Sequence, residues 1–239
     1  MSSRELASVS TTATANEPEL ESDMAAKQVT LTFDNGPTPH VTDQILGILD
    51  RAGIKTTFFV IGQRLDDPAA ADLMRAAHTA GHWIGNHTFT HSVALGDRTD
   101  RDYALREIEE TQQRIGSLTR PEKLFRPYGN DGLIGRHLLS RAALDHLLAE
   151  RYTTITWNSV PGDWKDADGW VETAMAQVRE QDWSVMVIHD IEAGCLVRLP
   201  ELLQRLTDLG ATFEQAIPRS VILTEAGRTV SMSPDFMAD

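Results

Sequence analysis

Residues 28–37 read Gln-Val-Thr-Leu-Thr-Phe-Asp-Asn-Gly-Pro, and this stretch decides how the fold is interpreted. Apolar and polar residues alternate over 28–33, which predicts a β-strand with one apolar face. The Gly-Pro pair at 36–37 ends that strand abruptly. Asp34 and Asn35 therefore stand side by side at a strand end, which suits a reactive group better than a core residue. An isolated Asp-Asn pair is more often a turn or a helix cap, so its interpretation depends on the rest of the chain.

Downstream of this stretch, strand-like and helix-like segments alternate. Further strands are predicted at 55–61, 82–86, 123–128, 153–158, 184–189 and 211–216, with a short additional one at 220–223. Helices are predicted at 41–51, 68–80, 100–115, 135–151, 170–179 and 199–209. Such alternation is typical of an α/β fold, in which a parallel sheet carries crossover helices. About seven such units in this length favour a barrel of about seven parallel strands, with an open doubly wound sheet as the alternative.

The composition fits one large domain, because the chain has 239 residues and 41% of them are hydrophobic. We expect a disordered arm over 1–27, where Ser, Thr, Ala and Glu prevail without periodicity. A folded domain over 28–225 and an irregular tail over 226–239 follow. The arm lacks the apolar segment of a secretory signal, so we expect a cytoplasmic protein.

The charge balance and the cysteine count argue against several classes of partner and chemistry. The formal net charge is −13 and no Lys/Arg cluster stands out, so nucleic acid is not an expected partner. No stretch approaches the roughly 18–20 apolar residues that span a bilayer. The single cysteine, Cys195, excludes an internal disulfide and is a weak candidate for a nucleophile. None of these features indicates an oligomeric state.

Side chains capable of chemistry gather at the ends of the predicted strands. They are Asp34, His87, Arg126, Asn158 and His189. In barrels and open α/β sheets, ligands bind beyond the carboxyl ends of the strands. This placement predicts one site at that edge of the sheet.

Two histidines, His87 and His91, lie four residues apart after one of these strands. On a helix or in a tight turn, this spacing can aim two imidazoles at one point, and neutral imidazole is a good ligand for zinc and similar cations. Capping and surface hydrogen bonds are an equally common use of such a pair. A third ligand from another strand end would favour the metal.

Other strand ends supply candidate partners for these residues. His189 is a candidate general acid, since its ordinary pKa lies near neutral, and a packed core histidine is the alternative. Arg126 could pair with Asp34 and hold it ionised. Asp163 could orient His189, and Trp164 could line the face of a sugar. A surface arginine, a structural aspartate and a packed tryptophan are the alternatives.

Taken in order, these motifs are far more specific than any one of them. They resemble the polysaccharide deacetylase family, the NodB-homology domain of carbohydrate esterase family four. The resemblance runs over roughly 28–218 and is carried by 32–37, 57–60, 81–91, 126–129, 163–164 and 188–190. It implies a distorted (β/α) barrel and makes 28–225 a polysaccharide-deacetylase-like catalytic domain.

The resemblance implies an amide hydrolase that removes an N-acetyl or similar acyl group from an amino sugar or polysaccharide. It also implies a divalent metal, with zinc the expected ion. His87, His91 and Asn35 stand at the positions of the metal ligands. Asp34 stands at the position of the catalytic base and His189 at that of the acid.

The same resemblance gives roles to the neighbouring residues. Arg126 would hold the base, and Asp163 would tune the acid. Tyr128 would lend its backbone N–H to the oxyanion and line the substrate site together with Trp164. The arginine motif, Arg-Pro-Tyr-Gly, is one residue shorter than the Arg-Pro-Pro-Tyr-Gly of the family, which brings Arg126 and Tyr128 closer in sequence.

Asn35 is the main departure, since the family has a second acid at this position. A carboxamide is neutral and a weaker donor to zinc, so we expect weaker metal affinity, an altered metal preference or no metal. One alternative is a metal-independent amide hydrolase, like the allantoinase-related members, with Asp34 and His189 as the acid–base pair. Another is an inactive carbohydrate-binding protein, which would need no such set of reactive residues. The particular sugar or amide is not readable from these motifs.

Overall fold

The computed structural model describes residues 26–98 and 100–238. The arm predicted over 1–27 therefore lies outside the described residues except for its last two positions. The strands are β1 (Gln28–Asp34), β2 (Thr57–Val60), β3 (Trp83–Asn86), β4 (Leu124–Phe125), β5 (Thr153–Ile155), β6 (Trp183–His189), β7 (Thr212–Phe213), β8 (Ile222–Glu225) and β9 (Arg228–Thr229). The helices are α1 (Thr42–Ala52), α2 (Pro68–Thr79), α3 (Arg101–Ile115), α4 (Arg141–Ala149), α5 (Trp170–Glu180) and α6 (Leu199–Asp208).

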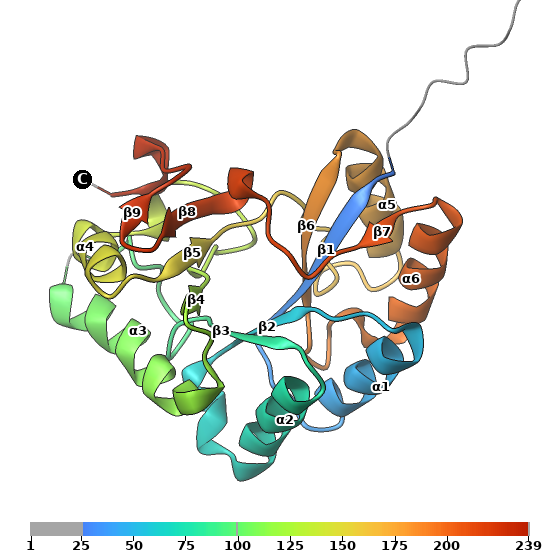
Figure 1. Ribbon diagram of the computed structural model, residues 1–239, viewed down its shortest axis with the longest axis horizontal. Coiled ribbons are helices and arrows are strands. Elements are labelled where there is room, and N and C mark those ends of the chain that lie inside the picture. The colour runs from blue at the N-terminus through green and yellow to red at the C-terminus, as the bar shows by residue number, and fades with distance from the viewer. Residues whose placement is uncertain (1–25, 99, 239) are drawn as a thin grey trace, which may run out of the picture.

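The strands form one strongly curled sheet with the helices on its outside (Figure 1). Its order is β6-β1-β2-β3-β4-β5-β8-β9, and β7 also pairs with β1. Strands β1 to β7 pair in parallel, which confirms the predicted α/β class and the parallel sheet. Because the sheet is curled and parallel, the carboxyl ends of β1, β3, β4 and β6 meet around one rim.

Two further pairings complete the sheet. Beyond β5, Ser159 forms a parallel bridge to Met186 of β6, which brings the two sides of the curl together. On the other side, β8 and β9 form an antiparallel hairpin that adds to β5. The predicted boundary at residue 225 therefore falls inside this hairpin.

Strand β1 shows how the alternating sequence positions the site. Val29, Leu31 and Phe33 are buried in the largest apolar cluster, together with residues of α1, α5 and α6. Because successive side chains on a strand point to opposite faces, Thr32 and Asp34 turn to the inside of the curl. Thr32 is fully buried there, and Asp34 is 3% exposed.

One helix is shorter than the sequence predicts. The pattern over 135–151 predicts a single helix, but α4 begins only at Arg141. Ser140 caps it by accepting a hydrogen bond from the Ala143 backbone N–H at 3.3 Å. Just before the cap, Leu139 is extended and bridges to Met237. This pairing with the end of the chain interrupts the helix that local sequence favours.

In the described part of the chain, no helix has the length and apolar character needed to cross a membrane.

Candidate active site

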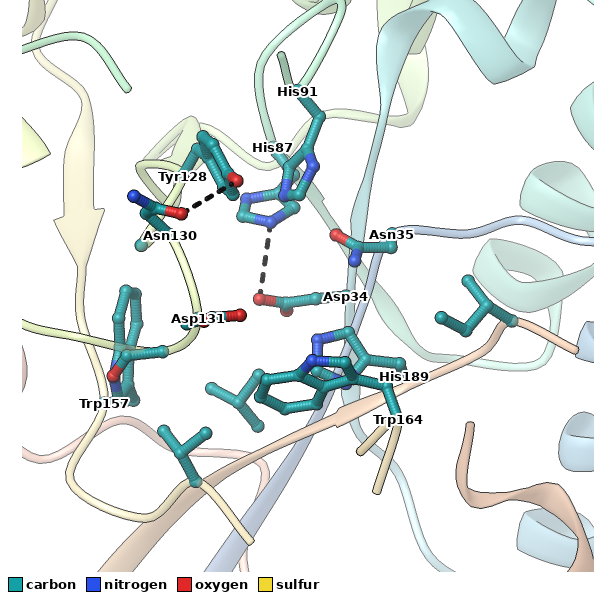
Figure 2. Close-up of a pocket in the computed structure, with 15 residues that line it drawn as sticks. Asp34, Asn35, His87, His91, Tyr128, Asn130, Asp131, Trp157, Trp164 and His189 are labelled. Carbon is teal, nitrogen blue, oxygen red and sulfur yellow. Dashed lines mark hydrogen bonds and ion pairs between the residues drawn. The ribbon is translucent and has the colours of Figure 1, made fainter. Parts of the chain in front are cut away.

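A cavity of about 160 Å³ opens at the rim where the strands end. Seven of the predicted site residues line it, namely Asp34, Asn35, His87, His91, Tyr128, Trp164 and His189 (Figure 2). Two others, Arg126 and Asp163, are fully buried and contact residues that line the cavity. Asn158 is not among the lining residues, because its carboxamide bonds the backbone of Trp183 and Val185 where the sheet closes.

Asp34 is held from behind by Arg126. The guanidinium donates hydrogen bonds to Asp34 Oδ1 at 2.8 Å and to Thr32 Oγ1 at 2.6 Å. It also donates to the Thr156 carbonyl at 3.2 Å and stacks over the Phe59 ring, 4.0 Å from its centre. The predicted Arg126–Asp34 pair is therefore confirmed. One carboxylate oxygen is fixed by the arginine, and the other, Oδ2, lies on the side of the histidines.

His189 lies next to Asp34, as its partner in the parallel β1–β6 pairing. Its side chain is held by Asp163. The Asp163 carboxylate accepts from the His189 backbone N–H and from Nδ1, each at 2.8 Å. A carboxylate accepts this bond, so Nδ1 carries the proton and Nε2 is left free for other contacts. Burial lowers the pKa of His189, but the hydrogen bond and charge of Asp163, with help from Asp34 and Asp190, raise it overall. The Trp164 ring packs edge-on against the imidazole, with 4.5 Å between the ring centres.

His87 presents a lone pair toward Asp34. Its Nδ1 lies 2.9 Å from the Arg126 carbonyl, which can only accept, so this nitrogen carries the proton. Nε2 is then the unprotonated nitrogen, and it faces Asp34 Oδ2 at 3.5 Å. Burial lowers the pKa of His87 to about 3, which keeps the ring neutral near neutral pH. Two acceptor atoms facing each other repel unless a cation or a water proton lies between them.

His91 joins His87 through an irregular turn. Thr88 and His91 both have left-handed backbone conformations, with φ of 65° and 52°. The turn brings the two imidazole rings to 4.7 Å between centres, and the Tyr128 ring lies 4.1 Å from that of His91. Burial lowers the pKa of His91 to about 3, so this ring is also neutral.

Asn35 completes this side of the cavity. It too has a left-handed backbone, with φ of 76°, a conformation that Asn tolerates better than most residues. Its Oδ1 is buried and accepts no hydrogen bond from any described residue. In Figure 2 the carboxamide oxygen faces the side on which His87 and His91 lie. The following residue, Gly36, has to be glycine, because a Cβ there would clash with the Asp190 carboxylate.

These residues fit a divalent cation. Among residues 26–98 and 100–238, no three His, Cys, Asp or Glu side chains form a metal-binding group, and the third donor beside the histidines is Asn35. The set nevertheless offers two neutral imidazoles and a buried amide oxygen that lacks a partner. Amide and imidazole are both common ligands of divalent metals.

The structure also adds residues that the sequence motifs do not single out. Asn130, Asp131 and Trp157 line the cavity, on the side away from Asn35 (Figure 2). The Trp157 indole N–H donates to the Gly132 carbonyl at 3.0 Å and so anchors the loop after Tyr128. Asp131 forms an exposed ion pair with Lys165 at 3.3 Å. Trp157 is the second-last residue of the strand predicted over 153–158, and this place near a strand end is the one sequence signal that could have identified it.

Comparisons with known proteins agree with this geometry. The family model described as polysaccharide deacetylase matches residues 21–142. A chitooligosaccharide deacetylase of Rhizobium leguminosarum bv. trifolii is 33% identical over 171 residues, which cover 71% of this chain and 73% of that protein. The peptidoglycan-N-acetylmuramic acid deacetylase PdaC of Bacillus subtilis is 32% identical over 188 residues, or 77% of this chain. The match spans only 37% of the length of PdaC.

Solved structures are similar over most of this chain. A family 4 carbohydrate esterase from Streptomyces lividans in complex with acetate is 28% identical, with a TM-score of 0.67 over 82% of this chain and 96% of that one. A family 4 acetyl xylan esterase from Clostridium thermocellum in complex with a cobalt ion is 27% identical. Its TM-score is 0.62, over 79% of this chain and 87% of that one.

Proposed function

The chain belongs to the polysaccharide deacetylase family, and we propose that it hydrolyses the amide bond of an N-acylated amino sugar, alone or within a polysaccharide. The observation that carries this proposal is that one cavity holds a carboxylate and an imidazole, each fixed by a buried residue of opposite charge. Asp34 is fixed by a buried arginine, and His189 is fixed by a buried aspartate. Such a pair suits a reaction that needs a base and an acid at the same time.

In the proposed reaction Asp34 is the base. Arg126 occupies Oδ1, so Oδ2 is the oxygen that takes a proton from the attacking water. The water oxygen then bonds to the acyl carbon, and the carbonyl oxygen gains negative charge. The backbone N–H of Tyr128 is the proposed donor to that oxygen, as the family resemblance implies.

His189 is the proposed acid. Its raised pKa favours the form protonated on both ring nitrogens, and Asp163 occupies Nδ1. The Nε2 proton is therefore the one available to the leaving nitrogen. When the carbon–nitrogen bond breaks, that nitrogen takes the proton and leaves as an amine, and the acyl group leaves as a carboxylic acid.

A divalent cation fits this mechanism on the side opposite His189. His87, His91 and Asn35 would hold it, since both imidazoles are neutral and the Asn35 oxygen lacks a partner. A cation bound there would supply Lewis-acid polarisation of the acyl carbonyl and would make the attacking water more acidic. The cobalt ion in the Clostridium relative supports a divalent metal for this chain, and zinc is the ion we propose to test first.

The substrate class follows from the relatives and from the cavity. Chitooligosaccharides and peptidoglycan are the substrates named for the two curated relatives. The cavity, of about 160 Å³, is smaller than a typical pocket for a whole ligand, which holds about 300–1,000 Å³. It therefore suits an acyl group with part of a sugar ring. Trp157, Trp164 and Tyr128 line it, and aromatic rings pack well against sugar faces.

Asn35 favours a second candidate, a metal-independent amide hydrolase on the same fold. A carboxamide brings no negative charge to the cation, whereas the family carries an acid at this position. In this alternative Asp34 and His189 act as the acid–base pair without a metal. The retained pair His87 and His91 supports the metal-dependent reaction as the first proposal.

Acetate release decides between these candidates. The purified chain is incubated with N-acetylated chitooligosaccharides and, separately, with peptidoglycan, once after treatment with a chelator and once after reloading with zinc or cobalt. We expect the chelated protein to lose acetate release and the reloaded protein to regain it. Full activity after verified metal removal would establish the metal-independent alternative. No acetate in any condition, on chitooligosaccharides or peptidoglycan, would contradict the proposed hydrolysis.

A further inference from the structure

A buried glutamate lies behind the two candidate metal ligands. Glu107 is on α3, a helix whose exposed face is strongly charged, yet this side chain is fully buried. Glutamate is almost never fully buried unless it is paired. The partners of Glu107 lie in the turn between His87 and His91.

The carboxylate binds this turn through three hydrogen bonds. Oε2 accepts from the backbone N–H groups of Phe89 at 3.1 Å and Thr90 at 2.8 Å. Oε1 accepts from the Thr90 hydroxyl at 2.9 Å. Successive backbone N–H groups that converge on one carboxylate oxygen form an anion-binding nest.

The turn needs this support because its backbone is irregular. Thr88 and His91 have left-handed conformations, which are costly for residues other than glycine. On the other side of the turn, the carbonyls of Thr88 and Phe89 accept hydrogen bonds from Gly62 and Gln63. Without Glu107, the half-buried N–H groups of Phe89 and Thr90 would lose their acceptor, and backbone N–H groups shielded from water are costly to leave unpaired.

A second contact ties the same turn to the same helix. The Asn86 carboxamide accepts from the Thr88 N–H at 3.0 Å and donates to the Ile108 carbonyl of α3 at 2.8 Å. Glu107 and Ile108 are adjacent on that helix, so the hydrogen bonds of the Glu107 carboxylate and of the Ile108 carbonyl both hold the turn to the same part of α3. The positions of both imidazoles therefore depend on α3, which contributes no residue to the cavity itself.

We propose that Glu107 is a positioning residue that sets the spacing of His87 and His91 for a divalent cation. The inference rests on the proposed function, because it assigns these two histidines to the metal. Residues outside the ligands that hold them in place typically change metal affinity about 10- to 100-fold when replaced. An ordinary loop cap would affect stability alone and leave the metal affinity of the folded protein unchanged.

The test is a titration of metal-free protein with cobalt, followed by the visible absorption of the bound ion. Glu107→Leu removes both acceptor oxygens, and with them all three hydrogen bonds, at similar volume, and we expect cobalt to bind about 10- to 100-fold more weakly, with an altered spectrum. Glu107→Gln keeps an oxygen for the two backbone N–H groups, so it should restore most of the affinity. Glu109→Leu, at an exposed position of the same helix, is the matched control and should bind cobalt like the wild type.

A folded Glu107→Leu protein that binds cobalt within about twofold of the wild type, with the same spectrum, would overturn the proposal. So would an equal loss in Glu109→Leu, since that would trace the effect to the helix. If Glu107→Leu does not fold, Thr90→Val removes the hydroxyl bonds to Glu107 and to Ser92, keeps both backbone bonds to Glu107, and should weaken binding about two- to tenfold. An unchanged affinity there would also refute the role.

Cobalt binding is measured without substrate, so a failure of hydrolysis leaves this test intact. A wild-type protein that binds cobalt but releases no acetate contradicts the proposed function alone. A wild-type protein that binds no cobalt overturns both the metal assignment and the role of Glu107.

Discussion

Replacing Asp163 by asparagine should change the pH dependence of the reaction more than its optimum rate. Asp163 is fully buried and accepts two hydrogen bonds from His189, from the backbone N–H and from Nδ1. The Asp163→Asn variant keeps the shape but removes the charge that stabilises the protonated imidazole. Burial then dominates and lowers the pKa of His189, so the acid loses its proton at lower pH.

The magnitude follows from the lost charge. A hydrogen bond to a charged partner contributes about 1.5–3 kcal/mol, and about 1.4 kcal/mol corresponds to a tenfold change in proton affinity. On the alkaline side, the variant should therefore lose roughly 10- to 100-fold more activity than it loses at its optimum. The assay is kcat/KM for acetate release as a function of pH, compared between the two proteins.

The same substitution predicts a pH-dependent loss of stability. The folded pKa of His189 is raised, so its pairing with Asp163 stabilises the fold fully below the unfolded pKa, about 6.5. That stabilisation is lost as the pH rises through the folded pKa. Denaturant unfolding should show a larger difference between the two proteins at acidic than at alkaline pH. An alkaline limb that does not move in Asp163→Asn, with the protein folded, would refute His189 as the acid.

Two further substitutions test the metal ligands. Asn35→Asp places a carboxylate beside the two imidazoles. It should tighten cobalt binding by about tenfold or more, because it adds a negative charge next to the cation. Weaker binding in a titration would mean that Asn35 does not face the metal. His87→Ala removes an imidazole and should weaken cobalt binding by more than about 100-fold, since replacing residues that only support the ligands already costs about 10- to 100-fold. Elemental analysis that shows a fully metal-loaded variant would refute the assignment of His87 as a ligand.

Much of the fold could be predicted because the local sequence pattern and the tertiary structure agree over most of the strands and helices. The alternation over 28–33 gives β1, and the strand ends place Asp34, His87, Arg126 and His189 around one rim. The helix predicted over 135–151 was wrong where a distant segment intervened, since Leu139 pairs with Met237 near the end of the chain. Short-range periodicity carries no information about such a contact.

Site residues could be predicted from the sequence where they lie at strand ends. They could not be predicted where side-chain burial determines whether a residue contacts the site. Asn158 follows a strand, yet its amide bonds the backbone at the sheet closure and not the cavity. Glu107 shows the reverse, because it lies among exposed charges on α3 and its sequence context is that of a solvated residue. Only the packing of α3 against the histidine turn makes its carboxylate part of the site.

The most direct test of the proposed mechanism is acetate release by the Asp34→Asn variant. The carboxamide that replaces the carboxylate keeps the size of the side chain but cannot take a proton from water. We expect the variant to stay folded and to bind cobalt, and to release acetate from N-acetylated chitooligosaccharides at least about 10²-fold more slowly, the lower end of what a positioned base contributes. An unchanged rate in the metal-loaded variant would contradict the claim that Asp34 is the base of an amide hydrolase.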